Sequence, residues 1–479
     1  MSYRNPTLAL FGAFALAGCA DEATEPNQNG NNDAGPTTGT LPSQVTCEGD
    51  VCRVAAPANN PIVEDVTFTA DKRWLLQGGV FIGNDADETT LTIEPGTTLY
   101  GETASKAFLV IRRNAKIEAN GTKEAPIVMT SSKEPGQRAR GDWGGLVING
   151  KATINTCPEG TSGACTAEGE GGTGAYGGDD DTDNSGTLRY VRVEFAGNPI
   201  TEDNELNGIA FQGVGSGTTL EYIQVHMADD DGIEFFGGTA SFKYVITTGI
   251  ADDNLDWTDG WRGKGQFYIA QQYSDDGDQG IEADNNGDAN AATPRSNPML
   301  SNRTLVGSPD SSDSDIGILL REGTGATIHS AVVVGFNDAC LDIDHPETWN
   351  NGEPVLAHSV VNCEKAYKYE KWDCDEDEAA ECAEAGVVEG DPREPWQVEA
   401  WFTGAAGNVK VDWPETGDRN LVLTDAYNET TPNFAPKADG EASSGGSVPN
   451  DSFFTDVTFR GAVDPANDWT TGWTTAAKN

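Results

Sequence analysis

Acidic side chains recur at almost regular intervals between residues 229 and 344 of this 479-residue chain. Apolar pairs spaced by one residue repeat from residue 209 to residue 343 at steps of 24, 22, 26, 37 and 23 residues. The residue inside each pair is, in order, Ala210, Glu234, Asp256, Glu282, Leu319 and Asp342. Acidic turns precede the pairs, at Asp229-Asp230-Asp231, Asp252-Asp253, Asp275-Asp276-Gly277-Asp278, Asp313-Ser314-Asp315 and Asp338. Gathered carboxylates suit hard cations, and Ca²⁺ takes about six to eight oxygen ligands in flexible geometry.

This spacing predicts that the acids stack in columns. Equivalent residues of parallel strands lie about 4.8 Å apart, and like charges at that distance repel unless their pKa values rise or a cation binds. We therefore predict one or more calcium sites whose ligands are Asp230, Asp231, Glu234, Asp252, Asp253, Asp256, Asp278, Glu282 and Asp342. The competing interpretation is a solvated acidic surface that binds no metal.

The elements that would position these acids are short strands. A second repeated stretch reads Thr187-Leu188-Arg189-Tyr190-Val191, then Thr219-Leu220-Glu221-Tyr222-Ile223, then Ser241-Phe242-Lys243-Tyr244-Val245. Short strands and turns at a repeat of 20 to 30 residues, without helical periodicity, indicate a β-solenoid. A propeller or sandwich is the all-β alternative, but tight two-residue hairpin signals are scarce.

Several segments resemble right-handed parallel β-helix proteins of the pectate-lyase-like superfold, and more closely a largely uncharacterised family of bacterial surface lipoproteins with that fold. They are Gly141-Asp142-Trp143-Gly144-Gly145-Leu146, residues 176–191, Asp231-Gly232-Ile233-Glu234-Phe235-Phe236-Gly237-Gly238 and residues 463–473. The resemblance implies an all-β, right-handed parallel β-helix with end caps and a small disulfide-bearing insertion.

The N-terminus predicts export. A charged start at Arg4 and an apolar stretch over residues 8–16 lead to Ala17-Gly18-Cys19, which resembles a bacterial lipobox with Cys19 as the lipidated residue. An ordinary signal peptide ending near a cysteine is the alternative. Ala20 stands where an Asp would favour inner-membrane retention, so the resemblance implies the outer membrane or cell surface, with membrane contact through the lipid.

The domain organisation follows from these segments. We expect a lipoprotein signal peptide at 1–18, a flexible tether with a small disulfide loop at 19–57, and the parallel β-helix at 58–363. A charged insertion follows at 364–395, and residues 396–479, with Trp469 and Trp473, are expected to cap the last turn. The segment around Trp74 is the candidate cap at the other end.

The cysteine count fits an exported protein. Nine cysteines less Cys19 leave eight, which fall in near neighbours: Cys47 and Cys52, Cys157 and Cys165, Cys340 and Cys363, Cys374 and Cys382. An even count predicts disulfides, here paired sequentially. A zinc site is the competitor, but there is no paired Cys-x-x-Cys and there are only four His.

Catalysis is the less favoured function. A calcium-dependent lyase of this fold would need an Arg or Lys base, for which Arg262 and Lys264 are candidates, and a glycoside hydrolase would need a carboxylate pair. With 77 acidic residues such pairs arise by chance, and His226, His329, His345 and His358 are isolated in sequence.

Charge and composition exclude other classes. The formal net charge is −47, which repels nucleic acid, and 11 Trp, 11 Tyr and 17 Phe are too many for a disordered acidic chain. The preferred function is a non-catalytic structural or adhesin-like protein that presents acids and aromatics to a glycan or cell-surface partner. The expected aromatic face comprises Tyr222, His226, Phe236, Trp257 and Trp261.

Overall fold

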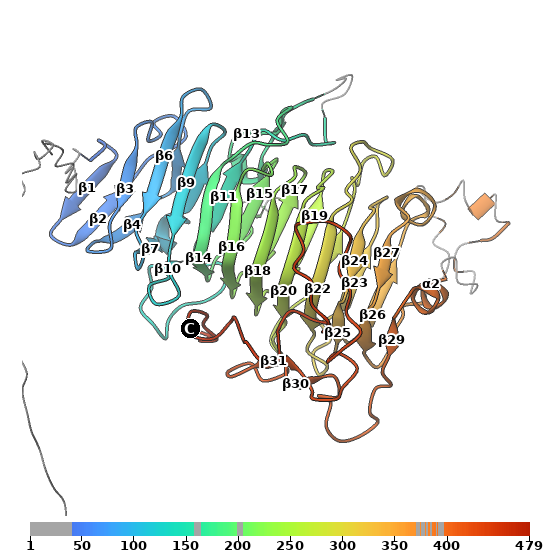
Figure 1. Ribbon diagram of the computed structural model, residues 1–479. Coiled ribbons are helices and arrows are strands. Elements are labelled where there is room, and N and C mark those ends of the chain that lie inside the picture. Colours follow the sequence, from blue (N-terminus) through green and yellow to red (C-terminus); the bar gives the residue numbers. More distant parts are fainter. Residues whose placement is uncertain are drawn as a thin grey trace, which may run out of the picture. The chain divides into compact units, whose positions relative to one another are not determined.

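Short parallel strands stack turn upon turn from one end of the molecule to the other (Figure 1). The computed structural model describes residues 41–157, 164–198, 205–369, 374, 379, 382–383, 386–388, 390 and 397–479. The signal peptide, Cys19, tether residues 19–40 and most of the 364–395 insertion therefore lie outside the described residues. Residues Leu41–Asn479 form one compact unit.

One wall of the coil is a sheet that has nine strands within the described residues; we call it the nine-strand sheet. Its strands, all parallel, are β5 (Gly79–Ile82), β8 (Phe108–Ile111), β11 (Leu146–Asn149), β15 (Ile209–Gln212), β17 (Ile233–Phe236), β19 (Leu255–Thr258), β21 (Glu282–Ala283), β23 (Ile316–Leu320) and β26 (Ala339–Ile343). Glycines before these strands permit the close stacking, because a Cβ on Gly208 or Gly232 would lie 2.6 Å from a carbonyl oxygen of the next turn.

The rest of the wall is a second sheet, which we call the long sheet, with 18 strands within the described residues. It contains β1 (Val45–Glu48), β2 (Val51–Val54), β3 (Val66–Phe68), β4 (Arg73–Leu76), β6 (Thr89–Ile93), β7 (Thr98–Gly101), β9 (Ala115–Asn120), β10 (Ile127–Ser131), β14 (Gly186–Glu194), β16 (Thr219–His226), β18 (Ser241–Thr248), β20 (Lys264–Gln271), β22 (Met299–Val306), β24 (Thr327–His329), β25 (Val332–Val334), β27 (Val355–Ala357), β28 (Val360–Asn362) and β29 (Val409–Lys410). The chain passes back and forth between the two sheets and so forms the expected right-handed parallel β-helix.

The longest strands bend at one residue of left-handed backbone. Tyr190, Tyr222, Tyr244 and Phe267 occupy this corner on successive turns, with φ of 48°, 54°, 59° and 61°. Such φ values are strained for side chains other than glycine. Ring stacking offsets the strain, because consecutive ring centroids lie 4.4, 4.6 and 5.0 Å apart.

The interior is filled by apolar columns from both sheets. The strand period of two directs alternate residues inward, so Ile233, Leu255 and Trp257 are buried. Trp261 is fully buried as well, stacked 4.2 Å from the ring of Phe235. The expected exposed aromatic face is therefore wrong for Trp257 and Trp261, which form part of the core.

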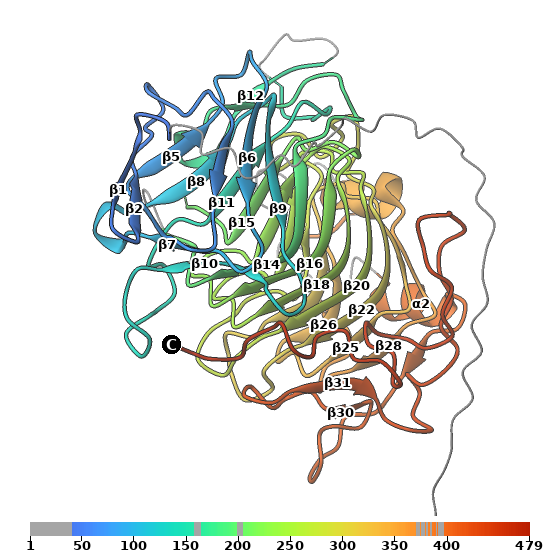
Figure 2. The ribbon, with the colours of Figure 1, turned by 60° about the vertical axis from the view of Figure 1, so that its left-hand side comes forward.

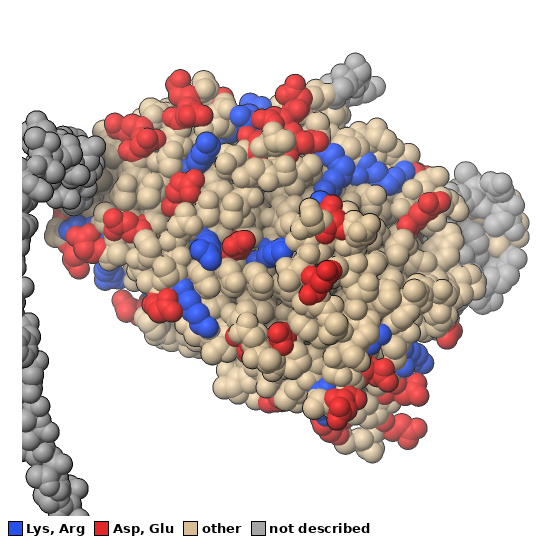
Figure 3. Space-filling model, viewed as in Figure 1, with Lys and Arg blue, Asp and Glu red and all other residues tan. Residues whose placement is uncertain are grey.

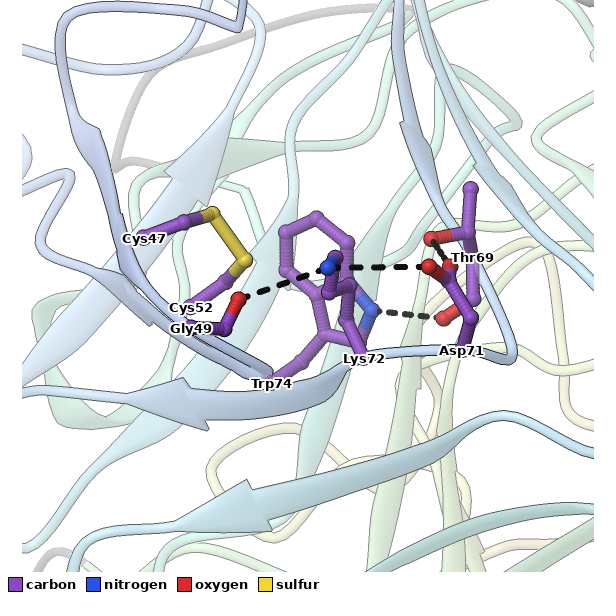
Figure 4. Close-up of a disulfide and its surroundings, with 7 residues drawn as sticks. All are labelled: Cys47, Gly49, Cys52, Thr69, Asp71, Lys72 and Trp74. Atoms are coloured by element: carbon purple, nitrogen blue, oxygen red, sulfur yellow. Dashed lines mark hydrogen bonds and ion pairs between the residues drawn. A yellow bond between two sulfur atoms is a disulfide. The ribbon is translucent and has the colours of Figure 1, made fainter.

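A hairpin closes the N-terminal end. Strands β1 and β2 pair antiparallel and are joined by the Cys47–Cys52 disulfide (Figure 4). Because β2 pairs with β4, the parallel sheet already begins within the range assigned to the tether. Trp74 of β4 does not cap this end but lies inside the coil, 4.1 Å from Phe68, with its indole N–H donating to the carbonyl of Thr69.

The other elements are small. They are β12 (Ala167–Glu168), β13 (Ala175–Tyr176), β30 (Leu423–Asp425), β31 (Asn433–Pro436), the 3₁₀ turns η1 (Thr103–Ser105) and η2 (Glu170–Gly172), the π turn η3 (Thr348–Gly352) and α2 (Val398–Gly404). Helix α2 buries Val398 and Phe402 at the last turn. No helix in the described part of the chain is long and apolar enough to cross a membrane.

The C-terminal segment runs back along the side of the coil (Figure 2). Trp473 packs edge-on against Tyr190 at 5.5 Å, and Trp469 packs against Tyr244 at 5.6 Å. Gln224 donates to and accepts from the backbone of Thr475. The prediction that Trp469 and Trp473 cap the last turn is therefore wrong: they cover the aromatic corner of the long sheet.

Four disulfides are present, Cys47–Cys52, Cys157–Cys165, Cys340–Cys363 and Cys374–Cys382. They follow the sequential pairing expected from the sequence.

Candidate functional site

One column of outward-pointing residues on the nine-strand sheet changes from apolar to acidic half-way along the coil. In register, its residues are Phe81, Val110, Val147, Ala210, Glu234, Asp256, Glu282, Leu319 and Asp342. The first four lie under an outer layer that includes Ile154, Tyr176 and Leu206. From β17 onward, four of the five residues at this position are carboxylates and one, Leu319, is apolar, so the sequence builds a polar site on an otherwise covered face.

The acidic column is buried, although it points outward from the coil. Glu234 and Asp256 are 8% and 9% exposed, and Asp231 and Asp253 of the preceding turns are 7% and 4% exposed. The solvated-surface alternative is therefore wrong for these four residues. Phe236 of β17 is also buried in the outer layer rather than displayed.

Two aspartates hold successive turns together. Asp231 Oδ1 accepts the backbone N–H of Asp253 at 3.1 Å, and Asp253 Oδ1 accepts that of Gln279 at 2.7 Å. Gln279 Oε1 continues the pattern by accepting the N–H of Ile316 at 2.9 Å. Each aspartate thus uses one oxygen in this ladder, which leaves the second oxygen for a ligand.

The predicted ligands converge in three groups. Within each group, one carboxylate oxygen per residue lies within 4.8 Å of the others: Asp230, Asp231 and Asp252; Asp231, Glu234 and Asp256; Asp252, Asp253 and Asp278. Asn207 Nδ2 donates to Glu234 Oε2 at 2.8 Å and fixes that side chain. Asp256 Oδ1 is buried without a hydrogen-bond donor among the described residues, and buried acceptors are seldom left so.

Burial and mutual repulsion raise the pKa values of these acids. Burial, followed by the charge of Asp252, raises the pKa of Asp230 to about 8. Burial, then Glu234 and Asp253, holds the pKa of Asp231 well above its usual range. The pKa values of Glu234, Asp253 and Asp256 are raised in the same way, so the cluster resists carrying its full negative charge at neutral pH.

The basic residues that pair with acids on this face lie near its last strands, β21 to β26. Arg321 Nη2 contacts Glu282 Oε2 at 2.6 Å and Arg321 Nε contacts Asp284 Oδ1 at 3.0 Å. Lys368 Nζ lies 3.8 Å from Asp342 Oδ2. Within the described ranges, no ion pair reaches Asp230, Asp231, Glu234, Asp252, Asp253, Asp256 or Asp278. Seven of the predicted ligands therefore stay together without an ion pair, and Arg321 acts on some of them only at longer range. Asp342 is separated from them by the apolar Leu319.

Sequence reasoning missed acids from the outer layer. Glu170 of η2 approaches the column from outside, and burial together with Asp259 and Glu205 raises its pKa to about 7. Its charge also acts on Asp230 and Glu234. Glu170 lies outside the repeat, so spacing could not have identified it. Asn207 could have been found, because it stands two residues before its strand as Asp231 and Asp253 do.

The candidate lyase bases lie elsewhere. Arg262 and Lys264 follow the C-terminal end of β19, whereas Asp252 and Asp253 precede its start, roughly 13 Å away along a four-residue strand. Arg262 Nη2 contacts Asp181 Oδ1 at 3.2 Å, and Lys264 Nζ contacts Asp451 Oδ2 at 2.6 Å. Both line a hollow of about 570 Å³ with Lys243, Phe453 and several Ser and Thr residues.

Two further predicted residues, Tyr222 and His226, belong to the long sheet. Tyr222 stacks within the aromatic corner. His226 is fully buried, with Nδ1 2.7 Å from Thr248 Oγ1 and Nε2 2.9 Å from the carbonyl of Ala477. Burial lowers the pKa of His226 to about 4, so the neutral ring anchors the C-terminal segment.

Comparison with known proteins gives a family but no close relative. No curated protein matches this chain. A solved structure, that of the Dettilon tailspike protein (gp208), is similar at a TM-score of 0.22 and 9% sequence identity, over 66% of this chain and 62% of that one. The alignment thus spans less than two thirds of the tailspike chain. A family model described as a pectate-lyase-like beta helix domain matches residues 60–402. Because that match covers most of the chain, as do the stacked strands, the protein belongs to the family of pectate-lyase-like β-helix domains.

Proposed function

We propose that this protein is a non-catalytic, surface-anchored β-helix that binds Ca²⁺ on its nine-strand sheet and presents the rigid coil to a glycan or cell-envelope partner. One observation carries the calcium part: seven carboxylates gather on neighbouring turns with no ion pair among the described residues. Buried charges need a partner, and a divalent cation would supply it.

The geometry suits calcium. Ca²⁺–oxygen distances are about 2.4 Å, so two ligands of one ion lie at most about 4.8 Å apart. The three carboxylate groups meet that limit. Mg²⁺ demands a smaller, nearly octahedral shell and gives up water reluctantly, which carboxylates contributed by separate turns would satisfy less well.

The basic residue beside the acids argues against a lyase. Such a base must lose its proton at working pH. Burial lowers the pKa of Arg321, but Asp284 and Glu282 outweigh that effect and the pKa is raised overall. Arg321 therefore acts as a fixed counter-charge, and Arg262 and Lys264 are engaged with Asp181 and Asp451.

The binding role rests on a different surface. The hollow beside Arg262 and Lys264 combines cations, hydroxyl groups and the ring of Phe453, which together suit a saccharide. Acidic and basic side chains are interspersed over the face shown in Figure 3, and most of that face is uncharged. A partner would meet no single-sign field on this side.

Calcium titration of the wild-type protein tests the metal site. We expect the melting temperature to rise when millimolar Ca²⁺ replaces a chelator, because a ligand of the folded state stabilises it by mass action. Mg²⁺ at the same concentration is the matched control and is expected to give a smaller rise. An unchanged melting temperature with Ca²⁺ would remove the calcium proposal.

Lipid labelling tests the proposed membrane anchor. The proposed anchor at Cys19 predicts that radiolabelled palmitate enters the wild-type chain in a Gram-negative host and that Cys19→Ser abolishes the label. Membrane fractionation then distinguishes the outer from the inner membrane. Label retained in Cys19→Ser would contradict the anchor and leave the calcium proposal untouched.

A further inference from the structure

An arginine is buried inside the coil with no polar partner. Arg303 of β22 is fully buried, and its column faces the interior, in register with Tyr268 of β20. Its Nε, Nη1 and Nη2 atoms make no hydrogen bond to any described residue. Arg460 is also buried, but its guanidinium donates to four backbone carbonyls, so it is the lack of partners at Arg303 that needs a physical explanation.

Aromatic rings offset only part of the free-energy cost of burying the Arg303 guanidinium. The guanidinium carbon lies 5.0 Å from the ring centroid of Phe242 and 5.4 Å from that of Tyr268. Such cation–π contacts are weaker than the penalty for burying an unpaired ion. Each unsatisfied buried N–H donor adds to that penalty. The rings also offer no acceptor to the N–H groups.

The charge itself persists at neutral pH. Burial lowers the pKa of Arg303 only to about 9, with Tyr268 opposing the decrease. The Tyr268 hydroxyl is shared with Thr247 Oγ1 at 2.7 Å, so the nearest phenol is already engaged. Described carboxylates form no ion pair with Arg303. Water would satisfy the N–H groups but would bring no compensating charge.

A glycine on the preceding turn makes space for the guanidinium itself. Gly265 is in register with Leu300, and a Cβ added there would collide with Arg303 Nη2. Any larger residue at 265 would therefore displace the guanidinium.

We propose that the coil interior holds a small monovalent anion, chloride in ordinary buffers, against the N–H groups of Arg303. The anion would both neutralise the buried charge and accept its hydrogen bonds, as charge-assisted pairs do elsewhere. This site is independent of the proposed function: it lies inside the coil, takes the opposite charge to Ca²⁺ and requires none of the acidic column.

Thermal melts in chloride test this site. Chloride is varied against gluconate, an anion too large for the interior, at constant ionic strength and with chelator throughout. Above its dissociation constant, chloride should raise the melting temperature by about 1.5 °C per tenfold increase for a chain of this size. Arg303→Met should abolish the slope, and the exposed Arg53→Met should retain it as the matched control. An equal slope in Arg303→Met would overturn the proposal.

A second measurement does not depend on the variant's folding. Crystals of the wild-type protein soaked in bromide should show an anomalous peak within hydrogen-bond distance of the Arg303 guanidinium. Ordered water without bromide at that place would overturn the anion site. Because chelator is present in the melts, either negative result leaves the calcium proposal standing, and a failed calcium titration leaves the anion site standing.

Discussion

Asp256 combines the two features that define the acidic column: it points outward from the coil, yet it is buried. One of its oxygens has no donor among the described residues, and burial together with Glu282 raises its pKa. A carboxylate in that position destabilises the fold when it is charged and unpaired. The presence of an acidic residue at this buried position is explained if a cation is the partner of its carboxylate.

The first prediction follows for Asp256→Asn. Removing this charge should leave the melting temperature in chelator unchanged or higher, because repulsion with Glu234 and Glu282 is relieved. The rise caused by Ca²⁺ should fall by at least half, because one ligand loses its charge. Calorimetric calcium titration and thermal melts measure both effects. Asp456→Asn, at an exposed position away from the column, is the control and should behave as wild type.

The position of a residue in the fold could be predicted where the repeat determines it, and not elsewhere. The column residues Glu234, Asp256 and Glu282 stand in register as the spacing indicated. Trp257 was misassigned to the surface although it is the next residue after Asp256, and strand alternation directs it inward. The outer layer over this face includes Ile154, Tyr176 and Leu206, which belong to neither repeat, so the spacing could not predict it.

At the scale of elements, the C-terminal segment is held by contacts between residues remote in sequence. The hydrogen bonds from Gln224 to Thr475 and from Arg192 to Trp473 join β16 and β14 to the end of the chain. No periodicity links such positions, so the sequence could predict the strands but not the course of this segment. Its apolar residues suggested a cap, and only the tertiary contacts show what they cover.

The second prediction concerns that segment. Trp473→Ala removes a buried indole that packs on Tyr190 and Tyr222, which costs roughly 3–5 kcal/mol in a core. Because the contact lies near the chain end, we expect local undocking rather than global unfolding. Limited proteolysis should cut residues 460–479 at least tenfold faster than in wild type. Trp413→Ala, a partly exposed indole, should leave the rate unchanged.

The third prediction concerns the Cys340–Cys363 disulfide. It joins β26 of the nine-strand sheet to the residue after β28 of the long sheet and closes 23 residues of chain. The chain-entropy relation assigns a loop of this length about 3 kcal/mol. Replacing both cysteines with Ala should lower the free energy of unfolding in urea by about that amount. A loss no larger than that for the Cys47–Cys52 pair, which closes five residues, would contradict it.

For the whole molecule, the net charge of −47 has two components with different physics. Exposed acids interact through water and are screened by salt over about 10 Å. The column acids are buried, so salt screens them little, and their pKa values rise instead. Composition could predict the charge but not this division, because the division depends on which turns the outer layer covers.

The fourth prediction is the pH dependence that this division implies. For the acids in and around the column the folded pKa lies above the unfolded value: about 8 for Asp230 and Glu282, about 7 for Glu170 and Asp284 and about 6 for Asp278. Between about pH 4 and pH 8 the folded state then binds more protons than the unfolded state, so metal-free protein should lose stability as pH rises through that window.

Calcium should reverse this loss, because it competes with protons for the same oxygens. The rise in melting temperature on adding Ca²⁺ should therefore be small at pH 5 and largest at pH 8. Melts of resin-treated protein at four pH values, with and without Ca²⁺, measure it. Repetition in about 0.5 M salt provides the control, since salt suppresses repulsion between exposed acids but not within the buried column. A metal-free pH dependence that disappears in salt would assign the effect to the surface, and the column would then need no cation.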